Sequence, residues 1–219
     1  MKKTLITGLL GATLALVAAC GPLQEGNRAV SLLSGVFGSL SGADDSPSEG
    51  GVAMTRAVIE AQEADLLRVS IISRDATAIL LKVATNGSKV TWASQDGLSL
   101  AFDRGLLVAS RGFGDDLMGT DISSAVASLR GGGNHLRTLD FLNGLDEIER
   151  RTFQCSTVVT GSESLTIVER TYQTTVLEET CTDSNFGFKN TYWRDRDGTI
   201  WQSRQWISVQ TGYLGYQRL

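Results

Sequence analysis

The stretch NGSKVTWASQDGLSLAFDRGLLVASR (residues 86–111) decides the fold of this 219-residue chain. Three dipeptides that end in glycine, Asn86-Gly87, Asp96-Gly97 and Arg104-Gly105, divide it at intervals of eight to ten residues. Glycine readily adopts the positive φ that tight hairpin turns require, and the segments between these turns are rich in β-forming residues. The stretch therefore predicts a β-meander, a run of antiparallel strands joined by short turns.

The same pattern extends in both directions along the chain. Strands are predicted over residues 66–72, 78–84, 89–94, 98–103, 106–111, 151–160, 165–181, 189–195, 199–210 and 213–216, with a turn at 161–164 and an interruption near Gln173. Helices are predicted over residues 55–63, capped by Thr55, and over residues 121–129, capped by Asp121 or Thr120. We interpret RGFGDDLMGTD (residues 111–121) as the joint between the meander and the second helix, with Leu117 and Met118 anchored in the core.

These elements make the chain a mainly β protein with eight to eleven strands and two or three short helices. Its two prolines, Pro22 and Pro47, both precede the predicted strands, which suits long uninterrupted ladders. An antiparallel sheet of this size has to curl, so we expect a barrel or half-barrel, with a β-sandwich as the alternative.

The first twenty residues resemble the signal sequence of a bacterial lipoprotein. Lys2 and Lys3 precede an apolar run that is too short to span a bilayer, and the run ends in Val17-Ala18-Ala19-Cys20. Small residues before a cysteine are typical of a lipobox, which predicts that Cys20 becomes the lipidated N-terminus. A plain signal peptide with a chance cysteine is the alternative.

The lipobox interpretation sets the expected organisation of the chain. Residues 1–19 would be the lipoprotein signal peptide, residues 20–51 the lipidated N-terminus and a flexible tether, and residues 52–219 a single β-rich domain. Gly21, the second residue after cleavage, favours the outer membrane over the inner one by resemblance to enterobacterial lipoproteins. We therefore expect a lipid-anchored protein whose domain faces the periplasm.

Charge and motifs exclude two classes of partner. The formal net charge of −4 becomes −6 when Lys2 and Lys3 leave with the signal peptide, and such an acidic chain is unsuited to nucleic acid. The glycine-rich segment SRGFGD (residues 110–115) lacks both the GxGxxG motif of dinucleotide-binding sites and the GK[ST] motif of a P-loop, which argues against a nucleotide site. We expect no nucleic-acid partner and no cofactor.

Cys155 and Cys181 are the two cysteines that remain beside Cys20. In an oxidising periplasm such a pair predicts a disulfide, here closing a loop of 27 residues. A metal or redox pair is the alternative, but no CxxC spacing supports it.

Several segments together resemble one family. They are the lipobox-like end at Cys20, MTRAVIEAQ before the first strand, the progression from NGSKVTWASQDG to GDDLMGTD, and FQCSTVV followed by a second cysteine. The chain resembles the YjbF family, the group 4 capsule polysaccharide lipoproteins related to GfcB, over residues 52–219 and most specifically over residues 90–121. The resemblance implies an outer-membrane lipoprotein of exopolysaccharide or capsule secretion with a barrel-like antiparallel fold. It brings no catalytic residue.

Candidate chemistry is sparse. His135 is the sole histidine, and because it follows three glycines without a GxSxG motif we expect a loop residue rather than a catalytic base. Asp115 and Asp116 are weak candidates for a metal site, since Leu117 and Met118 stand where a calcium loop would be polar. The acids available for paired-carboxylate hydrolysis are Asp103, Asp115, Asp116, Asp140, Asp146 and Glu147.

Tryptophans are the best candidates for contact with a glycan, because aromatic faces stack on the C–H surfaces of sugars. They are Trp92, Trp193, Trp201 and Trp206.

The expected function is a non-enzymatic accessory lipoprotein whose partners are the membrane, through its lipid, and a polysaccharide or its secretion proteins. A glycan-modifying hydrolase and a carrier of apolar ligands are the alternatives.

Overall fold

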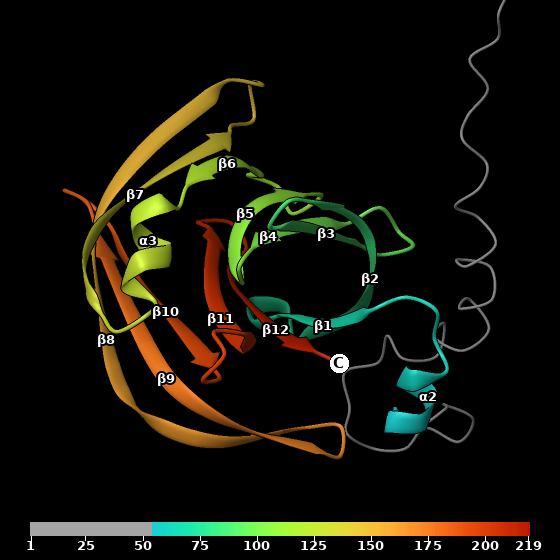
Figure 1. Cartoon of the computed structure of the whole chain (residues 1–219). Helices are drawn as coiled ribbons and strands as arrows, with labels where there is room; N and C mark the ends of the chain where they lie inside the picture. Colours follow the sequence, from blue (N-terminus) through green and yellow to red (C-terminus); the bar gives the residue numbers. More distant parts are fainter. Residues whose placement is uncertain (1–53) are drawn as a thin grey trace, which may run out of the picture.

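The computed structural model describes residues 54–219, which form one twelve-stranded antiparallel sheet (Figure 1). Its strands are β1 (Leu66–Ile71), β2 (Ala76–Asn86), β3 (Lys89–Ala93), β4 (Ser99–Asp103), β5 (Leu106–Arg111), β6 (Leu117–Asp121), β7 (Gly133–Leu142), β8 (Ile148–Ile167), β9 (Arg170–Thr182), β10 (Gly187–Arg194), β11 (Ile200–Ser208) and β12 (Gly212–Arg218). Their order in the sheet is β5-β4-β3-β2-β1-β12-β11-β10-β9-β8-β7-β6. The first and last strands, β1 and β12, are therefore neighbours near the middle of the sheet.

The sheet curls until its two edge strands, β5 and β6, lie side by side (Figure 1). Side chains join these strands: Leu117 N donates to Ser110 Oγ at 2.9 Å, and Arg111 Nη1 donates to the Leu117 carbonyl at 3.1 Å. The Asp116 carboxylate accepts from the main-chain nitrogens of Gly112 and Phe113 at 2.8 and 3.1 Å. The barrel is thus nearly closed, and its seam depends on polar side chains.

Helix α3 (Ser123–Ser128) lies against the concave face of β7, β8 and β10 (Figure 1). Its buried Ser128 hydroxyl lies 3.0 Å from the Thr157 hydroxyl of β8, and Arg194 of β10 donates to the Leu129 carbonyl at 2.7 Å. Arg194 thereby satisfies one of the carbonyls that every helix leaves free at its C-terminus. The helix fills space that strand side chains alone would leave open.

Helix α2 (Arg56–Glu60) binds the tip of the long β8–β9 hairpin. Arg56 donates to the carbonyls of Ile167 and Val168 at 2.8 and 2.9 Å, and Arg170 pairs with Glu60 at 2.5 Å. A short 3-10 turn, η1 (Ile72–Arg74), links β1 to β2. The start of the described chain therefore holds a hairpin tip that is more than 100 residues away in sequence.

The expected mainly β, barrel-like fold is confirmed, and the five predicted strands from residue 66 to residue 111 agree with β1 to β5 within a few residues. Thr55 caps α2 as expected, accepting from Val58 N at 3.3 Å. In the first hairpin the turn is shifted by one residue: Asn86 pairs with Lys89, and Gly87, at φ +59°, opens the turn.

Three expectations are wrong. The turn at residues 161–164 does not exist, because β8 continues through Gly161 with a bulge, and β9 is not interrupted at Gln173. The chain reverses instead at Val168 and Glu169, both at positive φ. Part of the expected joint is also a strand, β6. Residues 133–142, for which no strand is predicted, form β7.

The cap of the second helix also differs from expectation. Ile122 is the N-cap residue of α3 and makes no side-chain cap bond. Asp121 lies one residue earlier, where its Oδ1 accepts from Ser123 N at 2.9 Å. Of the two expected core anchors, Leu117 is buried and Met118 is half-buried.

Candidate functional site

A half-open cavity of about 310 Å³ lies where three hairpin turns meet the end of β12. We call it the arginine pocket and define it by its exposed rim residues Arg104, Arg218 and Asp197 and its buried floor residues Trp92, Phe102 and Tyr216. Phe102 and Tyr216 pack edge to face at 4.8 Å between ring centroids. Its volume falls at the lower end of the range that small-molecule sites occupy.

The hairpin turn that carries Arg104 is held in place by side chains of β11 and β12. Gly105 has φ +87°, and a Cβ atom there would lie 2.8 Å from Ile200 and 2.9 Å from the Tyr216 hydroxyl. Its carbonyl accepts from Gln205 Nε2 at 2.8 Å, while Gln205 Oε1 accepts from Leu107 N at 2.9 Å. Gln205 thus gives β5 the hydrogen bonds that a neighbouring strand would otherwise supply. Arg104 extends from a rigid turn.

The rim carries more positive than negative charge. Arg218 makes no ion pair with any carboxylate of residues 54–219, and the Nε of Arg104 lies 4.0 Å from Asp103 Oδ1, at the outer limit of a salt bridge. Asp197 is exposed and lies 3.6 Å from Arg196. Burial raises the pKa of the Tyr216 phenol, so its hydroxyl stays protonated. The pocket therefore offers cationic groups above a neutral floor.

A second polar group is buried on the inner face of the sheet, around Glu179 of β9. His135 Nε2 lies 2.8 Å from Glu179 Oε1, while Arg137, Asn190 and Tyr192 donate to Oε2 at 3.0, 2.7 and 2.8 Å. Because a carboxylate can only accept, His135 must donate through Nε2. We call these five residues the Glu179 network.

Burial alone would raise the pKa of Glu179, but the positive charge of Arg137 and the hydrogen bonds from His135, Asn190 and Tyr192 outweigh it. Together they lower the pKa from 4.5 to about 2. The opposite holds for Tyr192, whose pKa rises through burial and the neighbouring Glu179 charge. The network is a fixed ion pair with hydrogen-bond donors around it, and it is closed to solvent.

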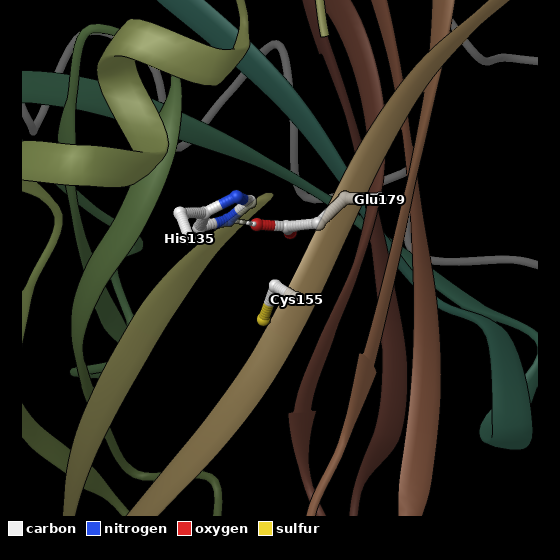
Figure 2. A group of neighbouring side chains, drawn as sticks. All are labelled: His135, Cys155 and Glu179. Atoms are coloured by element: carbon white, nitrogen blue, oxygen red, sulfur yellow. Dashed lines mark hydrogen bonds and ion pairs between the residues drawn. The ribbon is translucent and has the colours of Figure 1, made fainter. Parts of the chain in front are cut away.

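His135, Cys155 and Glu179 are the one group of metal-ligand residues that lies close together within residues 54–219 (Figure 2). Metal binding at cysteine requires a thiolate, whereas the sulfur of Cys155 is bonded to Cys181 at 1.99 Å. Glu179 Oε1 and His135 Nε2 are hydrogen-bonded to each other, so neither atom is free to ligate a metal, and Arg137 adds a positive charge at the same carboxylate. This donor set does not fit a metal ion.

The predicted disulfide between Cys155 and Cys181 is present. The two residues face each other directly in the β8–β9 ladder, with Cα atoms 4.1 Å apart. Cys20, the predicted lipidation site, lies outside the described residues. His135 is not the loop residue expected from the sequence: it lies on β7 and is buried.

The structure places the four candidate tryptophans in four different surroundings. Trp92 belongs to the arginine pocket, and Trp206 packs in the core, stacked on Phe188 at 4.7 Å. Trp193 donates to Glu163 at 2.6 Å. Trp201 stacks on Tyr172 at 3.7 Å and donates to Asp195 at 2.8 Å. They do not form one aromatic platform.

The candidate carboxylates separate in the same way. The Asp116 carboxylate accepts hydrogen bonds in the seam between β5 and β6, whereas Asp115 and Glu149 line a cavity of only about 80 Å³. Asp140 is bound by Arg150 through two hydrogen bonds of 2.7 and 2.9 Å. Among the described residues, Asp115 and Asp116 are not gathered with a third metal-ligand side chain.

Sequence reasoning missed the cations of the rim and most of the Glu179 network. For the network a signal existed: along β7 the buried residues His135, Arg137, Leu139 and Phe141 alternate strictly with more exposed neighbours. An arginine in phase with core residues must be buried, and a buried charge needs a partner. Arg104 and Arg218 carry no such signal, because only the fold brings them together.

Comparison with known proteins agrees with this fold. The family model described as group 4 capsule polysaccharide lipoprotein gfcB, YjbF matches residues 30–219. The crystal structure of the hypothetical lipoprotein YmcC from Escherichia coli (K12) is similar, with a TM-score of 0.66 and 20% identity over 74% of this chain and 87% of that one. No curated protein matches the chain in sequence. No helix within residues 54–219 is long and apolar enough to cross a membrane. Since the family model covers most of its length, the chain belongs to the YjbF family of group 4 capsule polysaccharide lipoproteins.

Proposed function

We propose that this chain is a non-enzymatic accessory factor in the assembly or secretion of an exopolysaccharide or capsule. It would be held at the outer membrane by lipid on Cys20, with its β domain in the periplasm. Family membership supports the polysaccharide context, and the lipobox-like sequence before Cys20 supports the anchor.

The arginine pocket is the observation that carries a binding function. Its described lining offers guanidinium groups, hydroxyls and buried aromatic residues, but Asp197 is the one carboxylate among them. Hydrolysis by paired acids needs two carboxyl groups on opposite sides of the scissile bond. The sole histidine of the chain is already bound to Glu179 in the core. The pocket is therefore equipped to hold a ligand rather than to cleave it.

The two alternative functions have less support. Asp115 and Glu149 do share a cavity, but its volume of about 80 Å³ is well below the few hundred Å³ that ligand pockets usually have. For a carrier of apolar ligands, the arginine pocket is a poor container, because such a ligand would leave Arg104, Arg218 and Asp197 without new partners.

Deletion of the gene, followed by complementation, tests the proposal. We expect surface polysaccharide to fall in the deletion strain and to return with the wild-type gene. Cys20→Ala should fail to restore it and should leave the membrane fraction, because cysteine lipidation is the proposed anchor. Unchanged surface polysaccharide in the deletion strain would refute the proposed function.

A second measurement separates binding from hydrolysis. Purified protein is incubated with the polysaccharide that the parent strain produces, and the chain length of the polymer is followed by size-exclusion chromatography. We expect the length distribution to stay constant. Progressive shortening, abolished by Asp115→Asn or Glu149→Gln, would instead support the hydrolase.

A further inference from the structure

We propose that the arginine pocket binds one acidic sugar residue, whose carboxylate pairs with Arg104 and Arg218. This inference rests on the proposed polysaccharide function and names the chemical class of its ligand. The cavity of about 310 Å³ is open on one side, so a residue within a polymer could enter while its neighbours remain outside.

Charge is the first argument for an acidic ligand. The chain as a whole is acidic, with a formal net charge of −4, yet the rim of this cavity has two arginines and one aspartate. Guanidinium groups match carboxylates in a bidentate geometry and hold them with charge-assisted hydrogen bonds. A single ligand carboxylate would neutralise the excess positive charge of the rim.

The two guanidinium groups are also available. Arg218 makes no ion pair within residues 54–219, and its guanidinium carbon lies 5.9 Å from the centroid of Trp201. Arg104 has only the distant Asp103 contact at 4.0 Å. Neither arginine is consumed by the fold, in contrast to Arg137, whose guanidinium is bound to Glu179 in the core. They can bind a ligand without first breaking a strong internal pair.

The third argument is preorganisation. Arg104 has φ +50° and stands beside Gly105, which is confined by Ile200, Tyr216 and the hydrogen bond from Gln205. Arg218 lies at the end of β12, inside the sheet. Because the backbone of both residues is fixed, less conformational freedom is lost when a ligand binds.

The floor and the opposite rim suit the sugar ring. Trp92, at 4% exposure, lines the cavity, and its indole nitrogen has no hydrogen-bond partner within residues 54–219. It can donate to a ring hydroxyl. Asp197, on the β10–β11 turn, can accept from hydroxyls. The pocket thus combines donors for a carboxylate with one donor and one acceptor for a polyol.

Binding of short oligosaccharides to the purified full-length lipoprotein in detergent tests the proposal. Trigalacturonate is the acidic probe and maltotriose the neutral probe of equal length, with calorimetry and Trp92-dependent fluorescence as readouts. We expect trigalacturonate to bind at least about tenfold more tightly than maltotriose and to weaken as salt is added.

Matched variants identify the site. Arg104→Gln and Arg218→Gln should each weaken trigalacturonate binding by about tenfold, because each removes a charge-assisted hydrogen bond. Arg74→Gln is the control, since Arg74 lies on η1 and is exposed but does not line the cavity. All three side chains are exposed, so thermal unfolding should be unchanged.

Four outcomes would overturn the proposal: no binding of trigalacturonate, equal binding of the two probes, full binding by the Arg104→Gln/Arg218→Gln variant, or displacement of trigalacturonate by an equal concentration of inorganic phosphate. The last would mean that the pocket recognises a simple anion. The accessory function fails separately, on the deletion phenotype. A double variant that loses binding yet restores surface polysaccharide would refute the role of the pocket in export and leave the accessory function standing.

Discussion

Acid should destabilise this domain through one buried carboxylate, Glu179. Its pKa falls from 4.5 to about 2 in the folded protein, so the native state binds a proton less readily than the unfolded chain does. For a group whose pKa is lowered by folding, the stabilisation is complete above the unfolded pKa and is lost as pH falls through the folded one. The sensitive window therefore extends from about pH 5 to about pH 2.

The size of the effect follows from the shift. At about 1.4 kcal/mol per pKa unit, a decrease from 4.5 to about 2 contributes about 3 kcal/mol to the free energy of unfolding at neutral pH. That is a large fraction of the 5–15 kcal/mol that is typical of a native domain. The stabilisation arises because the Glu179 carboxylate, which is buried away from water, is surrounded by the positive charge of Arg137 and by three further hydrogen-bond donors. These donors are His135, Asn190 and Tyr192.

Urea unfolding at a series of pH values measures this contribution. The reference variant is Arg137→Met/Glu179→Gln, which removes both charges of the buried pair and leaves a carbonyl oxygen for Asn190 or Tyr192. Three acids outside the network also have lowered pKa values: Asp121 through the Ser123 main-chain N–H, Asp140 through Arg150, and Asp183 through the Asn185 main-chain N–H. They are present in both proteins, so their contributions cancel in the difference.

We expect the wild type to lose about 3 kcal/mol more than the reference between pH 5 and pH 2. Glu179→Gln alone should cost about 3–5 kcal/mol at pH 7, because it leaves the Arg137 charge buried without a counter-charge, and Arg137→Met in the same chain should recover much of that loss. Parallel pH profiles for wild type and reference would refute the reasoning, since Glu179 would then not titrate differently on folding.

Three further outcomes test the rest of the fold. Replacement of Cys155 and Cys181 by alanine should lower the free energy of unfolding by about 3.5 kcal/mol, measured by urea unfolding with and without reductant, since the bond closes a 27-residue loop. Gly105→Ala should cost about 2–4 kcal/mol, because its Cβ would overlap Ile200, whereas Gly87→Ala, with open space around it, should cost about 1 kcal/mol in the same thermal assay. Gln205→Leu should cost about 1–3 kcal/mol in urea unfolding, because it leaves the buried main-chain nitrogen of Leu107 without an acceptor and removes one of the two donors to the Gly105 carbonyl.

Local sequence patterns were sufficient in the meander, where the hairpin turns contain glycine. The meander from residue 66 to residue 111 could be predicted because Gly87, Gly97 and Gly105 each adopt positive φ at or beside a hairpin turn. The disulfide could be predicted because only two cysteines follow Cys20. In both cases the decisive information lies in a residue type with a special property: glycine adopts positive φ without steric cost, and paired cysteines form disulfides in an oxidising compartment.

The β8–β9 hairpin shows why the rest could not be predicted. Its turn consists of Val168 and Glu169 at φ +39° and +66°, a conformation that these residue types rarely adopt. Arg56, from the other end of the domain, donates to the carbonyls at that turn, and it can offset the local cost. A tertiary contact across 111 residues thus selects the turn, while the glycine at 161 only makes a bulge.

The arginine pocket has the same dependence on contacts that no local pattern reveals. Arg104 is placed by Gly105, Gly105 is held by Gln205, and Gln205 belongs to β11, about 100 residues further along the chain. A change at Gln205 should therefore weaken acidic-sugar binding without touching the ligand, by loosening the turn that carries Arg104. We expect the same variant to keep the acid profile of the Glu179 network, because the side chains of that network belong to β7, β9 and β10. Its Asn190 accepts from the main-chain nitrogen of Trp206 on β11 at 2.7 Å, a donor that a side-chain change at Gln205 does not remove.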